Sequence, residues 1–419
     1  MGIPLLIFSF LNAMLLVLCE SEDYVSFHSS LTEIYPAYDY IRNSPLLKNL
    51  IYKIPVFSLK IGTPPREYNC TISTELYLTW LADASLSKTF IKSPLYNPSE
   101  SSSFHKGTDE QLLSVHFNSK KMNGTLNSDL FIYDYDGRYN FTFVLVNQTD
   151  ELMVFKLSGI IGIIKGYSGN SVYTKYQNSF MNVLEGSGLI SKRKFSFDFS
   201  RKNSSYHYVT FGKTYSNMSY CDSNFRFLDA VWYCDLYGIQ YGDKNYSTAE
   251  LLYFESAIPY ITLSDRLGKE VFEGIKEKHP DCDFRESEDK VQFVLCEGSY
   301  NELIKEELMF TLGTITVPIK IKDFIQGGFY DEATGRGRYY LLKIFREFNV
   351  DSSTFGAIAF KNRIVTFDID NHAIGFSKYF DDDMHQGEDY TKINKNIMTV
   401  CTIIEVISIL QLLYSKYKQ

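Results

Sequence analysis

The sequence lacks a long run of basic residues, and its net charge is −8. Proteins that bind nucleic acid usually carry a basic patch or stripe, so we expect no nucleic-acid partner. The sequence also lacks the Cys-x-x-Cys and Cys/His spacings of zinc sites, an HExxH motif and a Gly-x-Ser-x-Gly elbow. We therefore expect no metal and no cofactor, and the motifs give no support to a zinc-dependent or serine hydrolase.

Helical patterns are scarce, and strand patterns fill most of the chain. From residue 54 to about 378, short apolar runs alternate with turns at intervals of about 8 to 12 residues. Residues 195–199 and 365–369 alternate strictly between apolar and polar, as half-buried strands do. Only residues 178–185 and 265–277 have helical patterns. With 45% apolar and 16% aromatic residues, the composition fits an all-β protein with minor helices.

The first residues have the pattern of a secretory signal. An apolar run covers residues 3–18 and ends at Cys19, with Val17 and Cys19 as small residues before a cut. The usual Lys or Arg in front of the run is missing, and the alternative is a buried N-terminal helix. The interpretation that best fits the downstream features is a signal peptide over residues 1–19.

Seven Asn-x-Ser/Thr sequons follow, which favours passage through the secretory pathway. One of them, Asn69, lies in an apolar strand pattern and is the weakest candidate. The remaining six are the predicted glycosylation sites: Asn123, Asn140, Asn147, Asn203, Asn217 and Asn245. The predicted location is extracellular or membrane-anchored, with the body outside the cytosol.

Five of the seven cysteines lie in the body of the chain, an odd number that leaves at least one outside an internal pair. Cys282 and Cys296 are close in sequence and form the first candidate disulfide. Cys221 and Cys234 form the second candidate.

A second apolar run lies near the C-terminus. Residues 397–414 are interrupted by Glu405 and Gln411, and a helix of this length spans about 27 Å, barely a bilayer core. We expect a linker over residues 381–396 followed by a candidate transmembrane helix. The alternative is a helix that packs on the body.

The body contains a weak internal repeat. Residues 70–80 and, later, 158–163 form a loop segment and an apolar segment with glycine. Residues 252–263 and 355–360 show the same order in the second half. Two related lobes would produce such a pattern.

Five motifs follow one another along the body of the chain. They are Ile61-Gly62-Thr63-Pro64-Pro65, Leu95-Tyr96-Asn97-Pro98 with Ser101-Ser102-Ser103-Phe104, residues 113–129, residues 158–163, and the segment from Phe367 to Phe376. In this order they resemble the motifs of pepsin-type aspartic peptidases. By that resemblance the first motif is the entry strand of the family, residues 113–129 are its flap hairpin, residues 158–163 are a strand of its first lobe, and the last segment is its last strand.

The resemblance implies a bilobal pepsin-like acid protease fold with a deep cleft between the lobes. It implies an N-terminal lobe over residues 54–220 and a C-terminal lobe over residues 221–380. Residues 20–53 stand where the family has its inhibitory propeptide, but their basic residues are few: Arg42, Lys48 and Lys53. The expected partner is a peptide or protein ligand in the cleft, with a membrane contact through the C-terminal run.

The family's two Asp-Thr/Ser-Gly loops are altered here. The resemblance places Ser73 and Glu255 at the two catalytic aspartate positions, and Glu75 and Ala257 at the loop glycines. Thr74 and Ser256 occupy the middle of the loops, and Phe117 stands at the position of the flap tyrosine.

These departures predict the loss of peptide hydrolysis. The chemistry of the family needs two adjacent carboxyl groups that share one proton, and Ser73 carries no titratable carboxyl. The first hypothesis is a non-catalytic pseudopeptidase that binds a ligand in its cleft. The second is an active aspartic-type endopeptidase that uses a displaced pair, Glu75 with Glu255. A third, a Ser/His/Asp site or a Ser73–Lys120 pair, has weaker support.

Overall fold

The computed structural model describes residues 24–34, 52–86, 93–107, 113–117, 120–133, 137–149, 157–164, 179–200, 207–223, 231–287, 291–298, 300–331 and 336–380. The signal peptide, Asn203, the linker over 381–396 and the run over 397–414 lie outside these residues. Within the described residues no helix is long and apolar enough to cross a membrane. The described elements belong to one unit that ends at Tyr379.

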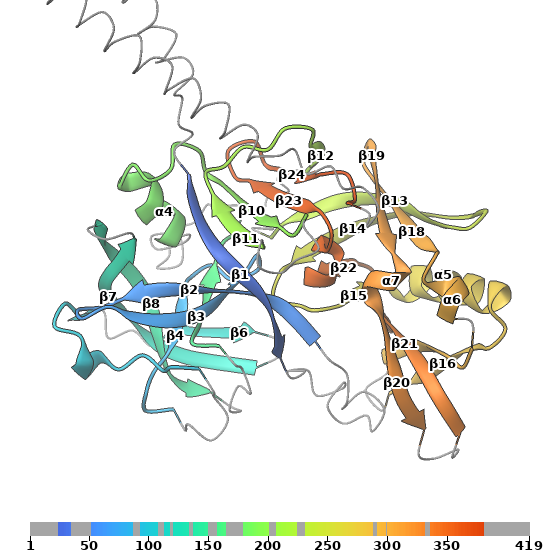
Figure 1. Ribbon diagram of the computed structural model, residues 1–419, viewed down its shortest axis with the longest axis horizontal. Coiled ribbons are helices and arrows are strands. Elements are labelled where there is room, and N and C mark those ends of the chain that lie inside the picture. Colours follow the sequence, from blue (N-terminus) through green and yellow to red (C-terminus); the bar gives the residue numbers. More distant parts are fainter. Residues whose placement is uncertain are drawn as a thin grey trace, which may run out of the picture. The chain divides into compact units, whose positions relative to one another are not determined.

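The larger sheet has 14 strands and contains segments from both ends of the body. Its main order is β12-β24-β23-β10-β11-β1-β2-β3-β9-β4-β8-β7-β5, and β6 pairs with β7. Figure 1 shows β1 (blue), β10 and β11 (green) and β23 (red-orange) in this sheet. The strands are β1 (Val25–Ile34), β2 (Tyr52–Ile61), β3 (Arg66–Ser73), β4 (Trp80–Ala82), β5 (His105–Lys106), β6 (Leu113–Phe117), β7 (Lys120–Tyr133), β8 (Gly137–Thr149), β9 (Gly159–Gly162), β10 (Lys194–Asp198), β11 (Tyr208–Phe211), β12 (Ser219–Asp222), β23 (Ile364–Asp368) and β24 (Ala373–Phe376).

The second sheet has 10 strands, all from the second half of the chain. Its main order is β16-β17-β21-β15-β22-β14-β13-β18-β19, and β20 pairs with β21. The strands are β13 (Tyr233–Tyr241), β14 (Lys244–Glu255), β15 (Ile261–Leu263), β16 (Cys282–Glu286), β17 (Val291–Cys296), β18 (Glu307–Leu312), β19 (Ile315–Lys320), β20 (Ile325–Asp331), β21 (Arg336–Glu347) and β22 (Ser353–Gly356). The predicted all-β class is confirmed.

The helices are few and short. They are α4 (Ser179–Gly186), α5 (Asp265–Lys278), α6 (Tyr300–Leu303) and α7 (Ile321–Phe324), with 3-10 turns η2 (Pro98–Glu100) and η4 (Ala357–Phe360). The two predicted helical segments, residues 178–185 and 265–277, are confirmed as α4 and α5.

The two strands predicted from strict alternation pair with each other. β10 and β23 run antiparallel with Phe195 opposite Phe367, and their rings stack with centroids 4.7 Å apart. Both rings are fully buried beside Trp232. This aromatic packing joins a strand near the middle of the chain to one near its end. The predicted lobe boundary at residues 220/221 falls inside β12, which pairs with β24 of the same sheet.

The motif near residues 95–104 donates hydrogen bonds to one buried carboxylate and is also bonded to the motif near residues 61–65. Asp129 is fully buried and accepts hydrogen bonds from Tyr96 Oη at 2.5 Å and from Ser103 Oγ at 2.6 Å. Ser101 Oγ accepts from the backbone amide of Thr63 at 2.9 Å. A buried carboxylate needs such donors, so Asp129 holds the 95–104 segment in place, and Ser101 in turn binds Thr63.

Both candidate disulfides are present. Cys221 is bonded to Cys234, and Cys282 is bonded to Cys296 on the paired strands β16 and β17. Within the described residues Cys70 is the free cysteine, and it is buried in the core.

The sequons differ in exposure. Asn69 and Asn123 are half-buried, whereas Asn140, Asn147, Asn217 and Asn245 are exposed. Glycosylation of the exposed four stays a prediction that their positions favour, because a glycan needs solvent around its asparagine.

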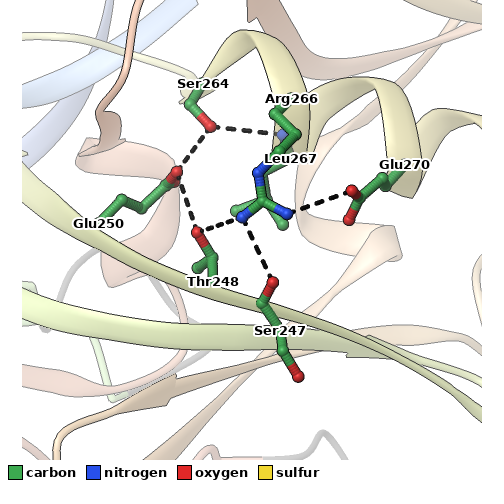
Figure 2. Close-up of polar contacts among 7 residues, drawn as sticks. All are labelled: Ser247, Thr248, Glu250, Ser264, Arg266, Leu267 and Glu270. Carbon is green, nitrogen blue, oxygen red and sulfur yellow. Dashed lines mark hydrogen bonds and ion pairs between the residues drawn. The ribbon is translucent and has the colours of Figure 1, made fainter.

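The start of α5 is held by a polar network that Figure 2 shows. Ser264 caps the helix by accepting from the Leu267 amide, and its hydroxyl donates to Glu250 on β14 at 2.7 Å. Glu250 also accepts from Ser353 Oγ at 2.5 Å, which adds β22 to the network. Glu250 therefore joins the helix to both strands that reach the site described below.

Glu250→Ala should lower the free energy of unfolding by about 2–3 kcal/mol, because the buried hydroxyls of Ser264 and Ser353 lose a carboxylate acceptor. The measurement is chemical denaturation of the full chain. Glu270, which forms an exposed ion pair with Arg266 in the same view, provides the control. Glu270→Ala should change stability by less than about 0.5 kcal/mol, and equal losses in the two variants would contradict the role given to Glu250.

Candidate functional site

Two loops occupy equivalent places in the two sheets. β3 ends at Ser73 and runs parallel to β9, with Ser73 opposite Gly162. β14 ends at Glu255 and runs parallel to β22, with Glu255 opposite Gly356. The strands after each loop repeat the pattern, because β4 pairs with β9 and β8 as β15 pairs with β22 and β21. The weak repeat in the sequence therefore corresponds to a repeated strand topology.

Glycine is required opposite each loop because the backbones approach closely. A Cβ atom on Gly162 would lie 2.2 Å from the carbonyl oxygen of Leu78. A Cβ atom on Gly356 would lie 2.3 Å from the carbonyl oxygens of Ile258 and Tyr260. Both glycines lie in segments that the sequence repeat includes, but the repeat alone did not indicate what they do.

Reciprocal hydrogen bonds join the two loops. Thr74 Oγ1 donates to the carbonyl oxygen of Phe254 at 2.5 Å, and Ser256 Oγ donates to the carbonyl oxygen of Ile72 at 2.6 Å. The backbone amide of Ser256 also donates to Thr74 Oγ1, at 3.2 Å. Both hydroxyl side chains are fully buried. The middle residue of each loop thus binds the strand that leads into the other loop.

Ser73 and Glu255 face each other at the centre of this junction. Ser73 Oγ donates to Glu255 Oε2 at 3.1 Å. The same Oγ accepts from the backbone amides of Glu75 at 3.2 Å and Leu76 at 3.1 Å, and the Ala257 amide donates to Glu255 Oε1 at 2.8 Å. Ser73 is 0% exposed and Glu255 is 3% exposed. The structure thus brings together the two residues that sequence resemblance singled out, 182 positions apart.

The environment of Glu255 favours its neutral form. Burial raises the pKa of Glu255, and the nearby Glu75 carboxyl raises it further, to about 8. The hydrogen bonds from Ala257, Ser73 and the Glu75 amide oppose this rise without cancelling it. Glu255 therefore carries a proton under acidic and neutral conditions.

Glu75 is the second acid near the centre. Its side chain is exposed, although the surrounding protein desolvates the carboxyl enough to raise its pKa. Within the described residues no hydrogen bond joins the carboxyl groups of Glu75 and Glu255. Glu75 is therefore the more solvent-exposed of the two acids.

The predicted flap forms a hairpin of β6 and β7, in which the backbone of Phe117 pairs with that of Lys120. The side chains of these two residues lie outside the described part. Farther along the hairpin, Leu113 and Met122 are buried in the apolar cluster that includes Leu76 of the first loop. Ala257 and Ile258 of the second loop belong to the same cluster. Residues that follow Ser73 and Glu255 in the two loops thus pack in one apolar cluster with the hairpin.

The described residues contain no cluster of three or more His, Cys, Asp or Glu side chains arranged to hold a metal ion. The functional groups at the junction include the Ser73 hydroxyl and the carboxyl groups of Glu75 and Glu255, which differ in exposure.

Thr74→Val should lower the free energy of unfolding by about 2–3 kcal/mol, because it leaves the Phe254 carbonyl and the Ser256 amide buried without this partner. The matched control is Thr74→Ser, which keeps the hydroxyl and should recover most of the loss. Denaturant unfolding of the full chain measures both variants. A serine variant as unstable as the valine variant would show that packing of the methyl group, rather than the hydrogen bonds, holds the loops together.

The pKa of Glu255 predicts a pH-dependent contribution to stability. Between the ordinary value of 4.5 and about 8, the folded protein keeps a proton that the unfolded chain releases. The free energy of unfolding therefore falls as pH rises through this range. Relative to Glu255→Gln, the parent should lose about 2 kcal/mol or more between pH 5 and pH 8. The difference in pH dependence between the parent and Glu75→Gln, a change at the exposed acid, should be smaller. Parallel curves of unfolding free energy against pH for the parent and Glu255→Gln would refute the raised pKa of Glu255.

Comparison with known proteins agrees with the strand topology and the paired loops. A family model described as eukaryotic aspartyl protease matches residues 56–379, which is most of the chain and includes both loops. A search of curated proteins found no match. The two sheets and the extent of the match confirm the bilobal pepsin-like fold, and the chain belongs to the eukaryotic aspartyl protease family.

Proposed function

We propose that this protein is a non-catalytic member of its family, which binds a peptide or protein segment between its lobes and does not hydrolyse it. The observation that carries the proposal is the pairing of Ser73 with Glu255 at the centre of the two loops. The family's reaction needs a carboxylate that activates water and a carboxylic acid that protonates the substrate. This pair supplies one carboxyl group at most.

The protonation state of Glu255 adds to this conclusion. Below its pKa of about 8 the group is neutral and cannot act as the base. Above that value it is ionised, but Ser73 offers no acid to complete the reaction. No pH therefore provides both functions at this pair.

Ser73 is also fully used in structural hydrogen bonds. Its hydroxyl donates to Glu255 and accepts from the amides of Glu75 and Leu76. A serine hydroxyl has one proton and two lone pairs, so these three contacts leave no capacity to hold a reacting water. The same contacts and complete burial speak against Ser73 as a nucleophile.

The parts of the fold that do not perform chemistry are retained. Thr74 and Ser256 hold the loops together, and Gly162 and Gly356 allow the close backbone approach. Boundaries between lobes are common places for ligands, and the family to which the chain belongs is one of proteases, whose substrates are polypeptides. A peptide or protein segment is therefore the proposed ligand. The two disulfides fit an oxidising compartment, so we place the protein in the secretory pathway, outside the cytosol.

A second candidate function is peptide hydrolysis by Glu75 and Glu255. The observation that favours it is the repulsion between the two carboxyl groups, which raises the pKa of Glu255 as in a proton-sharing pair. Against it, Glu75 is exposed, and among the described residues its carboxyl group forms no hydrogen bond to that of Glu255. A misplacement of about 1 Å can lower a rate roughly a hundredfold, and no hydrogen bond among the described residues holds the Glu75 carboxyl in position.

The full chain, secreted from eukaryotic cells, should cleave none of a broad synthetic peptide library between pH 3 and pH 8, as measured by mass spectrometry. It should retain a subset of the peptides uncut, above the level retained by an unrelated secreted β-protein. Parent cleavage that disappears in both Glu255→Ala and Glu75→Ala would establish the second candidate instead. If no peptide is retained, the binding half of the proposal fails.

The variant Ser73→Asp, Glu75→Gly, Glu255→Asp, Ala257→Gly tests whether the loops alone limit the chemistry. It restores two carboxyl groups and two small loop residues in the retained scaffold. Cleavage by this variant and not by the parent would support loss of chemistry with retention of the site.

A further inference from the structure

The N-terminal strand β1 lies in the interior of the larger sheet, between β11 and β2 (Figure 1). Val25–His28 pair with Tyr208–Phe211 of β11, and Ser29–Ile34 pair with Tyr52–Phe57 of β2. Among the described strands, β2 and β11 form no ladder with each other. β1 is therefore the strand that connects the β12-to-β11 part of the sheet to the part that begins at β2 and carries Ser73 on β3.

The side chains of β1 form part of the core. Val25 is fully buried in the main apolar cluster. The ring of Phe27 lies 5.3 Å from that of Phe57, 5.9 Å from Phe211 and 6.2 Å from Phe180, measured between centroids. These partners belong to β2, β11 and α4. Removal of β1 would therefore expose aromatic surface on three separate elements.

Polar groups of β1 also form hydrogen bonds with other strands and loops of the body. Ser29 is fully buried. Its backbone amide donates to the carbonyl oxygen of His207 at 2.8 Å, and its hydroxyl donates to the carbonyl oxygen of Val56 at 3.2 Å. Without β1, facing edges of β2 and β11 would lose their partners. Unpaired strand edges are costly when buried and promote aggregation when exposed.

The composition of β1 does not favour binding to an acidic site through ion pairs. Residues 24–34 contain no Lys or Arg, and their ionisable side chains are Tyr24, His28 and Glu33. The segment is held by strand pairing and apolar contact, and no described contact joins it to Glu255 or Glu75.

We propose that β1 is a permanent strand of the mature protein, which stays in the sheet even if the chain is cut between β1 and β2. The segment that stands in the position of a removable propeptide would then be a structural part of the body. This inference depends on the sheet and is independent of whether the protein hydrolyses peptides.

The test uses the full chain with a recognition sequence for a site-specific protease inserted between Asn43 and Ser44. After complete cutting, the N-terminal fragment should co-elute with the body in equal amounts during native size-exclusion chromatography and separate only in denaturant. Phe27→Ala should raise the rate of fragment release at least tenfold. Ser30→Ala should leave the rate within twofold, because Ser30 is exposed on the same strand and contacts only Thr32 through its hydroxyl.

Release of the fragment from a body that keeps its circular dichroism spectrum and stays monomeric would overturn the proposal. A second measurement avoids dependence on the cut protein. In hydrogen exchange on the uncut parent, the amides of residues 26–33 should be protected to within tenfold of those of β2. Exchange more than a hundredfold faster than in β2 would likewise overturn the proposal, whatever the behaviour of the variants.

Discussion

The structure depends on the reciprocal hydrogen bonds between Thr74 and Ser256 and the strands that lead into each other's loops. Each hydroxyl donates to a carbonyl of the strand that leads into the other loop, so a shift of either loop would break a buried hydrogen bond to the other. This arrangement needs only a short hydroxyl side chain at the middle position of each loop. It does not require an aspartate at the neighbouring position. The hydrogen bonds between the loops can therefore persist when the aspartate positions hold other residues.

The electrostatics of the junction follow from its burial away from solvent. Glu255 is almost fully buried, with one hydroxyl and backbone amides as its donors, so its charged form is disfavoured. A partner carboxyl could share its proton, but the partner present is Ser73. The result is a neutral, hydrogen-bonded centre, and the second acid of the site, Glu75, lies exposed.

Much of the fold could be predicted from the sequence because its signals are local. Strict alternation at Phe195 and Phe197 predicts a strand with one buried face, and the pattern over residues 265–277 predicts α5. The spacing of Cys282 and Cys296 suggested their disulfide. By contrast, the close approach at Gly162 and Gly356 and the role of Glu250 depend on segments distant in the chain, for which no local signal exists.

The identities of Ser73, Glu75, Glu255 and Ala257 were determined by the sequence alone, and so was the absence of a second acid at the paired positions. The tertiary structure decided that Ser73 and Glu255 meet, that burial raises the pKa of Glu255, and that Glu75 remains in contact with solvent. It also decided that β1 is an interior strand rather than an appended segment. The physical reason is that chemical identity belongs to each residue, whereas distance, solvation and strand pairing arise only when residues far apart in the chain pack together.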